Sequence, residues 1–380
     1  MYRLLDNIRI LDLTRLLPGP YATLLLADLG AEIIKIEDPS GGDPVRTLPP
    51  LANDGTSYLF HWLHRNKASC ALNLKTSVGR EVFLKLAQRA DAIIEGFRPG
   101  VTARLGVDYA SVRSVKPDIV YCSLTGYGQS SPYRDHVGHD LNYISIAGLL
   151  GLTGQDEPVI PSVPVADLVG GTLAALSIVA ALLKRARTGN GEYIDLALTD
   201  AALSLMALHF ADYFGTQQSP QRGQLPLGGH YAFYAVYKTR DGRFLSLACL
   251  EPKFWQSFCE RVQQRDWVAR QFDPALTAEV QKLIESRSLA EWLSVLDSRQ
   301  IPVTPLYEDL AAVLQDPHVQ GRRLFVEELE QMASPIRLAQ ALPAPDRLAP
   351  HLGQQTDEIL SELGFAPSTI AGWRREGVIA

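Results

Sequence analysis

Cysteine is scarce in this chain, with four residues in 380, and none is spaced as part of a metal-ligand pair or a disulfide framework. Basic charge is not in excess either, since 36 Lys and Arg stand against 42 Asp and Glu, for a net charge of −6. The chain therefore lacks the basic footprint of a nucleic-acid-binding protein. The four cysteines are therefore interpreted as small apolar side chains of a protein in a reducing compartment. Because the overall charge is negative, any anionic ligand must be held by local Arg and Lys.

Targeting and membrane signals are missing as well. Residues 1–8 carry charges and lack the apolar core of a signal peptide. No apolar run reaches transmembrane length, because the longest, 168–183, is short and is broken by Gly170 and Gly171, so no membrane span is expected. The last three residues are not the peroxisomal tripeptide. We therefore expect a cytoplasmic protein that binds neither membrane nor nucleic acid.

What remains is the ordinary composition of a folded protein, 46% hydrophobic and 21% charged. Short β-rich runs alternate with helical runs, which predicts a doubly wound α/β domain with parallel strands. No G-x-G-x-x-G follows the first strand, so a dinucleotide site of that type is not indicated. The predicted strands are 8–13, 31–37, 71–74, 92–94, 118–124 and 192–198, and the main helices are 21–29, 78–90, 141–150, 168–183 and 201–214.

A change in composition marks a second domain. Residues 216–227 are rich in Gln, Pro and Gly and are interpreted as a linker. Two alternating runs after it are joined by Asp241-Gly242, which is a hairpin signal. We predict the N-terminal part of a large α/β domain over 1–200, a helix and linker over 201–227, a small domain over 228–320, and a return linker with the C-terminal part of the large domain over 321–380.

The segment 138–171 gathers side chains that exchange protons near neutral pH, namely His139 and Asp167. Asp167 stands directly before the helix predicted at 168–183. There its carboxylate would accept from first-turn N–H groups at the positive end of the helix dipole, and both effects would keep it ionised. The plain alternatives are a helix N-cap for Asp167 and a hydrogen-bonded structural role for His139. Spacing alone does not choose between these interpretations.

The sequence Gly-His-Asp-Leu-Asn-Tyr at 138–143 resembles the active-site segment of the family III CoA-transferases, and it matches the α-methylacyl-CoA racemase branch of that family. Asp167 matches the aspartate shared by both branches, whereas transferases of the family usually lack a histidine at the position of His139. The resemblance extends from Leu5 to Gly364. It implies a split Rossmann-like large domain with a parallel sheet, a smaller α/β domain, and an interlaced homodimer.

The resemblance also implies which residues hold coenzyme A, as part of an acyl-CoA substrate and with no further cofactor or metal. Arg104 would bind the CoA phosphates, since a guanidinium suits phosphate oxygens. Its plain alternative is a solvated cation at a helix end. Asp38 departs from the formyl-CoA transferases of the family, which carry a basic residue there. The other residues expected on CoA are Arg15, Pro18, Arg46, Leu72, Gly96, Phe97, Arg98 and Tyr127.

Three further positions are expected to lie on the acyl side. Gly228 and Gly229 resemble the glycine loop that covers the reacting acyl group. Glu251 resembles the racemase glutamate that hydrogen-bonds the catalytic histidine. The plain alternative for Glu251 is a carboxylate favoured by the dipole at a helix N-terminus.

These features support three functions. The leading one is racemisation at the α-carbon of a 2-methyl-branched acyl-CoA, in which His139 and Asp167 take and return the proton on opposite faces and Glu251 orients the imidazole. The alternative is CoA transfer between carboxylic acids through an aspartyl-CoA intermediate on Asp167. The third is a non-catalytic CoA-binding protein, which needs Arg104 but neither His139 nor Asp167. The sequence does not identify the acyl group.

Overall fold

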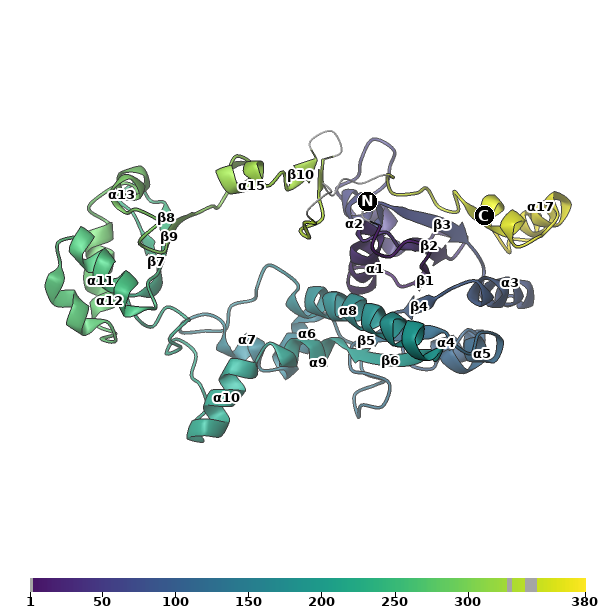
Figure 1. Cartoon of the computed structure of the whole chain (residues 1–380), viewed down its shortest axis with the longest axis horizontal. Coiled ribbons are helices and arrows are strands. Elements are labelled where there is room, and N and C mark those ends of the chain that lie inside the picture. Colours follow the sequence, from purple (N-terminus) through teal and green to yellow (C-terminus); the bar gives the residue numbers. More distant parts are fainter. Residues whose placement is uncertain (1–2, 327–329, 339–346) are drawn as a thin grey trace. The chain divides into compact units, whose positions relative to one another are not determined.

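The computed structural model describes residues 3–326, 330–338 and 347–380 (Figure 1). Within the return segment predicted at 321–380, positions 327–329 and 339–346 lie outside the described residues. The chain forms two compact units. The larger is assembled from Met1–Ala147, Val163–Leu205 and Arg323–Ala380, and the smaller from Gly148–Ser162 and Met206–Arg322.

A six-stranded parallel sheet forms the middle of the larger unit, in the order β3-β2-β1-β4-β5-β6. Most of its strands are rich in Ile, Leu and Val and buried on both faces, as expected where helices cover a parallel sheet. The predicted α/β class is thereby confirmed. The strands are β1 (Arg9–Leu13), β2 (Glu32–Glu37), β3 (Lys67–Ala71), β4 (Ala92–Glu95), β5 (Val120–Thr125) and β6 (Glu192–Ala197).

Helices cover both faces of this sheet. The helices of the larger unit are α1 (Pro18–Asp28), α2 (Tyr58–His64), α3 (Ser77–Gln88), α4 (Val101–Leu105), α5 (Tyr109–Val115), α6 (Asp140–Ile146), α8 (Val165–Thr188), α9 (Leu198–Ser204), α16 (Thr356–Glu362) and α17 (Pro367–Arg375). The unit also contains η1 (Pro44–Thr47) and the short strands β10 (Phe325–Val326) and β11 (Gln331–Met332). Leu11 and Leu13 of β1 pack in a core with Phe83 of α3 and with side chains of α5 and α16. The alternate residue of β1, Asp12, faces α1 and accepts from Thr23 Oγ1 at 2.6 Å.

Helix α8 is continuous over 24 residues, and two glycines let it approach its neighbours closely. A Cβ on Gly171 would lie 2.5 Å from the carbonyl oxygen of Pro18 in α1, and one on Gly170 would contact the side chain of Leu198 in α9. The glycines therefore allow close packing. Contrary to the sequence expectation, they do not break the apolar run, which forms one helix. Among the described residues, α8 is the one helix long and apolar enough to cross a membrane by length and composition, so the expectation that no apolar run reaches that length is wrong. The core helix of a folded domain passes the same test, so no membrane span follows from this finding. Helix α8 packs against α1, β5, β6 and α9.

The third strand of the sheet differs from the sequence prediction. It is β3 at Lys67–Ala71 and not 71–74. The side chain of Lys67, at the start of this strand, is buried, and its Nζ donates to the carbonyl oxygen of Pro20 at 2.9 Å and to Thr23 Oγ1 at 2.7 Å. Beyond β3, Leu72 forms only an isolated bridge with Ile379.

Two helices predicted as continuous are divided in the structure. The helix expected over 141–150 ends at Ile146, because Gly148 takes a φ of +81° in the left-handed region. A separate turn, α7 (Leu149–Leu152), follows it. The helix expected over 201–214 is likewise two helices, α9 and α10 (Ala207–Thr216).

The smaller unit is built on a three-stranded antiparallel sheet in the order β7-β8-β9. The strands β7 (Tyr234–Lys238) and β8 (Phe244–Ala248) form the predicted hairpin, with Gly242 at a φ of +79°. An aromatic core that includes Trp255, Phe258 and Trp292 packs with the sheet. The remaining elements are α11 (Pro252–Arg261), η2 (Arg265–Arg270), α12 (Leu276–Ile284), α13 (Leu289–Val295), β9 (Val303–Leu306), α14 (Leu310–Leu314) and α15 (Pro317–Gly321).

Candidate functional site

The strand order of the large sheet marks a position for a ligand. β1 and β4 are neighbours, and the chain leaves them toward opposite edges of the sheet. In open α/β sheets a crevice forms at the carboxyl ends of two such strands. Two cavities lie there, and Thr14, Arg15, Phe97 and Arg98 line both of them. We call them the first and the second compartment.

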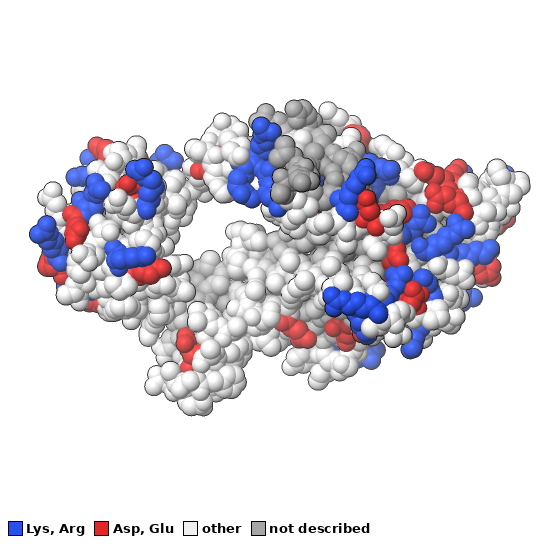
Figure 2. All heavy atoms as spheres, in the orientation of Figure 1, with Lys and Arg blue, Asp and Glu red and all other residues white. Residues whose placement is uncertain are grey.

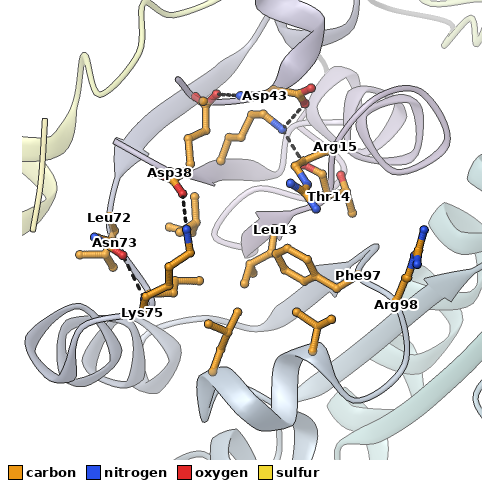
Figure 3. Close-up of a pocket in the computed structure, with 17 residues that line it drawn as sticks. Leu13, Thr14, Arg15, Asp38, Asp43, Leu72, Asn73, Lys75, Phe97 and Arg98 are labelled. Atoms are coloured by element: carbon orange, nitrogen blue, oxygen red, sulfur yellow. Dashed lines mark hydrogen bonds and ion pairs between the residues drawn. The ribbon is translucent and has the colours of Figure 1, made fainter. Parts of the chain in front are cut away.

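The first compartment has a volume of about 390 Å³ and is drawn in Figure 3. Phe97 forms part of an apolar wall, and the guanidinium of Arg15 lies 5.0 Å from the centroid of its ring. At an exposed part of the lining, Lys75 Nζ lies 3.3 Å from Asp38 Oδ2. An apolar wall with charged groups around it suits a planar ligand that carries polar or anionic substituents. Other lining residues are Leu72, Asn73, Leu74, Val101 and Leu105.

A buried ion pair supports the loop that carries Arg15 (Figure 3). Lys35 Nζ donates to the carbonyl oxygen of Thr14 at 2.8 Å and lies 2.9 Å from Asp43 Oδ2. Asp43 Oδ1 accepts from the backbone N–H of Leu16 at 3.2 Å. Leu16 has a φ of +68°, a left-handed conformation that costs about 1–2 kcal/mol, so these bonds stabilise a strained loop. Burial opposes the charge of Lys35, but the surrounding carboxylates raise its pKa, and it remains an ammonium group.

The second compartment has a volume of about 730 Å³ and brings His139 and Asp167 into one lining. His139 precedes the first turn of α6, and Asp167 lies in the first turn of α8 and is half-buried. The two helix starts converge because the backbone N–H of Asp167 donates to Oδ1 of Asp140 at 3.1 Å. The two proton-exchanging side chains of the sequence analysis therefore face the same cavity.

Asp167 is the third residue of α8, which begins at Val165 with Pro164 at the N-cap position. The expectation that Asp167 precedes the helix is therefore wrong by one helical turn. The expectation that its surroundings favour the ionised form is also wrong. Burial, followed by the negative charge of Asp140, raises the pKa of Asp167 to about 6, while His139 opposes the shift. A carboxyl group with a pKa near neutral can both accept and donate a proton.

The loop between β5 and α6 is held by packed rings. Tyr133 and His136 stack with centroids 4.8 Å apart, and Tyr127 meets Tyr143 edge-on at 5.3 Å. Tyr143 Oη donates to the carbonyl oxygen of Gly138 at 2.6 Å. A Cβ on Gly138 would lie 2.8 Å from Tyr127 Oη, so glycine is needed for this approach. The rings thus hold the residue before His139 against the loop.

Most residues expected on coenzyme A lie in these linings. Glu95 Oε2 accepts from the backbone N–H of Phe97 at 2.8 Å and shapes the turn after β4, which supplies several of them. Arg104 is exposed on α4, whose Val101 and Leu105 line the first compartment, but Arg104 itself is in neither lining. The expected residues that do line a compartment are Arg15, Pro18, Leu72, Gly96, Phe97, Arg98 and Tyr127.

Arg46 is not in either lining. Its Nε and Nη2 donate to Glu37 at 2.9 and 2.7 Å, and its Nη1 donates to the carbonyl oxygen of Pro350 at 3.1 Å. The guanidinium also lies 3.9 Å from the centroid of the Phe60 ring. These contacts satisfy Arg46 within the protein.

The predicted acyl-side residues belong to the smaller unit. Gly228 accepts at its carbonyl oxygen from Gln155 Nε2 at 2.6 Å, and Gly229 has a φ of +88°. Glu251 occupies the N-cap position of α11. These placements describe the smaller unit by itself.

Several polar lining residues were not singled out from the sequence, among them Asn73 and Lys75 in the first compartment and Arg134 and His136 in the second. Each of these four lies in the segment that follows β3 or β5. The rule that ligands bind beyond the carboxyl ends of parallel strands could have identified these segments. It could not have identified the individual residues, because loop conformation decides which side chains reach the cavity.

Comparison with known proteins agrees with this geometry. The family model described as CoA-transferase family III matches residues 5–356. The succinyl-CoA:mesaconate CoA-transferase of Haloarcula marismortui is 32% identical over 96% of this chain and 98% of its own length. The human alpha-methylacyl-CoA racemase is 30% identical over 96% of this chain and 95% of its own. The crystal structure of a CAIB/BAIF family protein from Brucella suis has a TM-score of 0.83 and 30% identity, covering 94% of this chain and 99% of that one.

Proposed function

Because the chain belongs to CoA-transferase family III, we propose that it is an enzyme that inverts the configuration at the α-carbon of a 2-methyl-branched acyl-CoA. The observation that carries this proposal is the presence of His139 and Asp167 in the lining of one cavity. A one-base enzyme or a binding protein would not require both side chains there. The proposal needs no cofactor beyond the CoA of the substrate.

The chemistry needs two groups that each exchange a proton near neutral pH. A thioester acidifies its α-proton because the carbanion delocalises into an enolate. One base removes the proton, and the conjugate acid of the other returns a proton to the opposite face. Imidazole has an ordinary pKa in this range, and burial with the charge of Asp140 raises the pKa of Asp167 to about 6. His139 and Asp167 thus meet the chemical requirement.

Stabilisation of the enolate oxygen must come from donors near Asp167. The amide of Asp167 itself already donates to Asp140 Oδ1, so it is not available for this purpose. The positive end of the dipole of α8, a helix of 24 residues, remains at this position. We assign Glu251 the role of orienting the imidazole of His139, on the strength of its match to the racemase motif.

The second candidate is transfer of CoA between carboxylic acids, and the relatives favour it. Transferases named for succinate, mesaconate and glutarate match 94–96% of the chain at 31–32% identity, alongside the racemase. In this reaction the Asp167 carboxylate attacks the thioester carbonyl and displaces CoA thiolate. The thiolate then attacks the aspartyl carbonyl of the mixed anhydride, which releases the first acid as its carboxylate and forms an aspartyl-CoA thioester. His139 would not be required. A CoA-binding protein without catalysis is the third candidate.

The two candidate reactions are separated by one experiment in heavy water. The protein receives a 2-methylacyl-CoA without an acceptor acid, and the α-carbon is examined for deuterium by NMR. Racemisation predicts that deuterium enters the α-carbon and that the two configurations interconvert. His139→Ala should abolish the interconversion and leave only one-sided exchange through Asp167. Trapping of Asp167 by hydroxylamine together with CoA transfer and no α-exchange would reject the racemase proposal.

We further propose a cytoplasmic homodimer whose subunits are interlaced. Helix α10 exposes Leu208, Phe210 and Phe214, with 55%, 40% and 69% of each residue accessible, and its surface in Figure 2 carries few charged residues. Such a face is a suitable protein contact. Interlaced subunits separate only on unfolding, so sedimentation should give a dimer at all concentrations. A monomer on dilution would contradict this.

A further inference from the structure

Cationic side chains are unevenly divided between the two compartments. Arg15 and Arg98 line both of them, and Lys35 and Lys75 line the first alone. Among the residues that the structure describes, Arg134 is the one Lys or Arg that lines the second compartment without lining the first. It therefore accompanies His139 and Asp167 in the space where the proposed function puts the acyl group.

The charge of Arg134 is not neutralised by a buried ion pair. Arg134 forms an ion pair with the adjacent Asp135, at 3.7 Å, and the side chains are 46% and 81% exposed. Such a pair is worth little in water. By contrast, Lys35 in the first compartment belongs to a buried ion pair, at 2.9 Å from Asp43. Arg134 is thus free to bind an anion.

The loop that carries Arg134 is preorganised. The backbone N–H of Arg134 donates to Ser131 at 3.0 Å, and that of His136 donates to Tyr133 at 2.8 Å. The Tyr133 and His136 rings stack on each other, and the His136 ring meets Tyr127 edge-on at 6.2 Å. The cation is therefore presented from a turn with its own hydrogen bonds and ring contacts, which lowers the entropy cost of binding through it.

The chemistry of a CoA thioester limits which anion reaches this position. All phosphates of CoA lie at its nucleotide end, and the pantetheine arm and the thioester are neutral. An anion beside His139 and Asp167 must therefore belong to the acyl group or to a free acid bound with CoA. A planar guanidinium binds a carboxylate through two parallel hydrogen bonds.

We infer that Arg134 is a specificity-determining residue that binds a free carboxylate in the second compartment, and that the substrates include acyl-CoAs whose chain ends in a second carboxylate. The inference rests on the proposed function, in that the second compartment holds the acyl end of a CoA thioester. It adds to that proposal a chemical class, the dicarboxylic acyl group, and the residue that selects it.

The test compares two ligands of equal chain length by calorimetry, glutaryl-CoA and pentanoyl-CoA. Wild-type protein should bind glutaryl-CoA about tenfold more tightly, the lower end of the range for hydrogen bonds to charged groups. Arg134→Gln should bring the ratio to about one by weakening glutaryl-CoA alone, and Arg134→Lys should restore part of the preference. Arg187→Gln, which replaces an exposed arginine of α8 that lines neither compartment, is the matched control and should keep the wild-type ratio.

A second titration separates the two sources of the carboxylate. Pentanoate is added to protein saturated with CoA. If pentanoate binding depends on Arg134, this residue binds the carboxylate of a free acid. If the preference for glutaryl-CoA depends on Arg134, the residue binds the carboxylate of the acyl chain. Equal ratios in wild type and Arg134→Gln, with no Arg134-dependent pentanoate binding, would overturn the inference alone. Failure of wild-type protein to bind CoA or either ester would overturn the proposed function and the inference with it.

Discussion

Asp140 and Asp167 are bound to each other through the backbone N–H of Asp167, which donates to Asp140 Oδ1 at 3.1 Å. The carboxylate of Asp140 therefore joins the first turns of α6 and α8 and at the same time places a negative charge beside a second carboxyl group. That charge is, after burial, the next cause that raises the pKa of Asp167 to about 6. One side chain thus contributes to both the geometry and the proton affinity of the candidate site.

Asp140→Asn should lower the pKa of Asp167 without breaking this contact. The amide oxygen of asparagine still accepts from the Asp167 N–H, but the negative charge is gone. Since burial remains, the pKa should fall only part of the way toward its ordinary value. The acid limb of the kcat/KM profile should therefore move to lower pH. Asp135→Asn, an exposed aspartate in the same loop, is the control, and an equal displacement there would argue against a specific effect.

Asp167→Asn should stabilise the protein while reducing activity by at least about 100-fold. Because burial and Asp140 raise the folded-state pKa of Asp167 from 3.8 to about 6, the folded state binds the proton more tightly than the unfolded state. Above a pH of about 6 the ionised carboxylate therefore lowers the free energy of unfolding, and this loss of stability becomes smaller as the pH falls toward the ordinary pKa of 3.8. The neutral amide should raise the free energy of unfolding by about 1–3 kcal/mol near pH 7. Urea titrations should give a smaller gain near pH 4.5; an equal gain at both pH values would refute the explanation.

Gly171→Ala should displace the start of α1 from α8. The new Cβ would lie 2.5 Å from the carbonyl oxygen of Pro18, so the helices must separate, at a cost of about 1–3 kcal/mol in unfolding free energy. Because Pro18 lines the second compartment, the KM for acyl-CoA should also rise. The matched control is Gly372→Ala in α17, where the nearest atom is 4.0 Å away in a flexible side chain. That change should stabilise by about 0.5–1 kcal/mol, since alanine is the better helix former.

Removal of the Lys35–Asp43 pair should weaken ligand binding through the loop that carries Arg15. Lys35→Met alone leaves a buried carboxylate unpaired and should cost about 3–5 kcal/mol of stability. Lys35→Met combined with Asp43→Asn removes both charges and should recover part of this loss. The hydrogen bond to Thr14 is still absent in the double variant, so its affinity for CoA esters should remain below that of the wild type in calorimetry.

A second buried pair provides the control for that experiment. Arg65 Nη2 lies 2.6 Å from Asp28 Oδ2, and neither residue lines a compartment. The combined change Arg65→Met and Asp28→Asn should also reduce stability but leave the affinity for CoA esters unchanged. Equal loss of affinity in both double variants would mean that Lys35 and Asp43 act only through general stability.

Local sequence signals were sufficient for much of the large sheet. Apolar runs such as 31–37 and 92–94 identify strands directly, and their alternation with helical runs identifies a parallel sheet. The strand at β3 was misplaced because Lys67 is buried, and its burial depends on Pro20 and Thr23 of α1. Likewise the glycines of α8 resemble helix breakers until their close neighbours are known. Both errors arise where contacts between distant segments override a local preference.

The sequence predicted which residues form the candidate site better than it predicted the electrostatics of those residues. The sequence motif led to His139 and Asp167, and both line the second compartment. The direction of the pKa shift of Asp167 was not predictable, because burial and the approach of Asp140 depend on the packing of α6 against α8. Arg134 carried no signal at all, since an arginine in a polar loop is ordinary on a protein surface. The role of Glu251 remains a prediction.

The edge of the large sheet is completed by residues that lie far along the chain. The backbone N–H of Ala71 in β3 donates to Thr356 Oγ1 across 285 positions of sequence, and the N–H of Asn73 donates to Val378. At roughly 5–20 residues per second, a ribosome needs about 15–60 s to cover that interval. Through this time the nascent sheet exposes an unpaired edge next to the first compartment, an aggregation hazard. Folding in the cell therefore depends on protection of this edge until residues 356–378 emerge, and a chain truncated before them should be removed as misfolded protein.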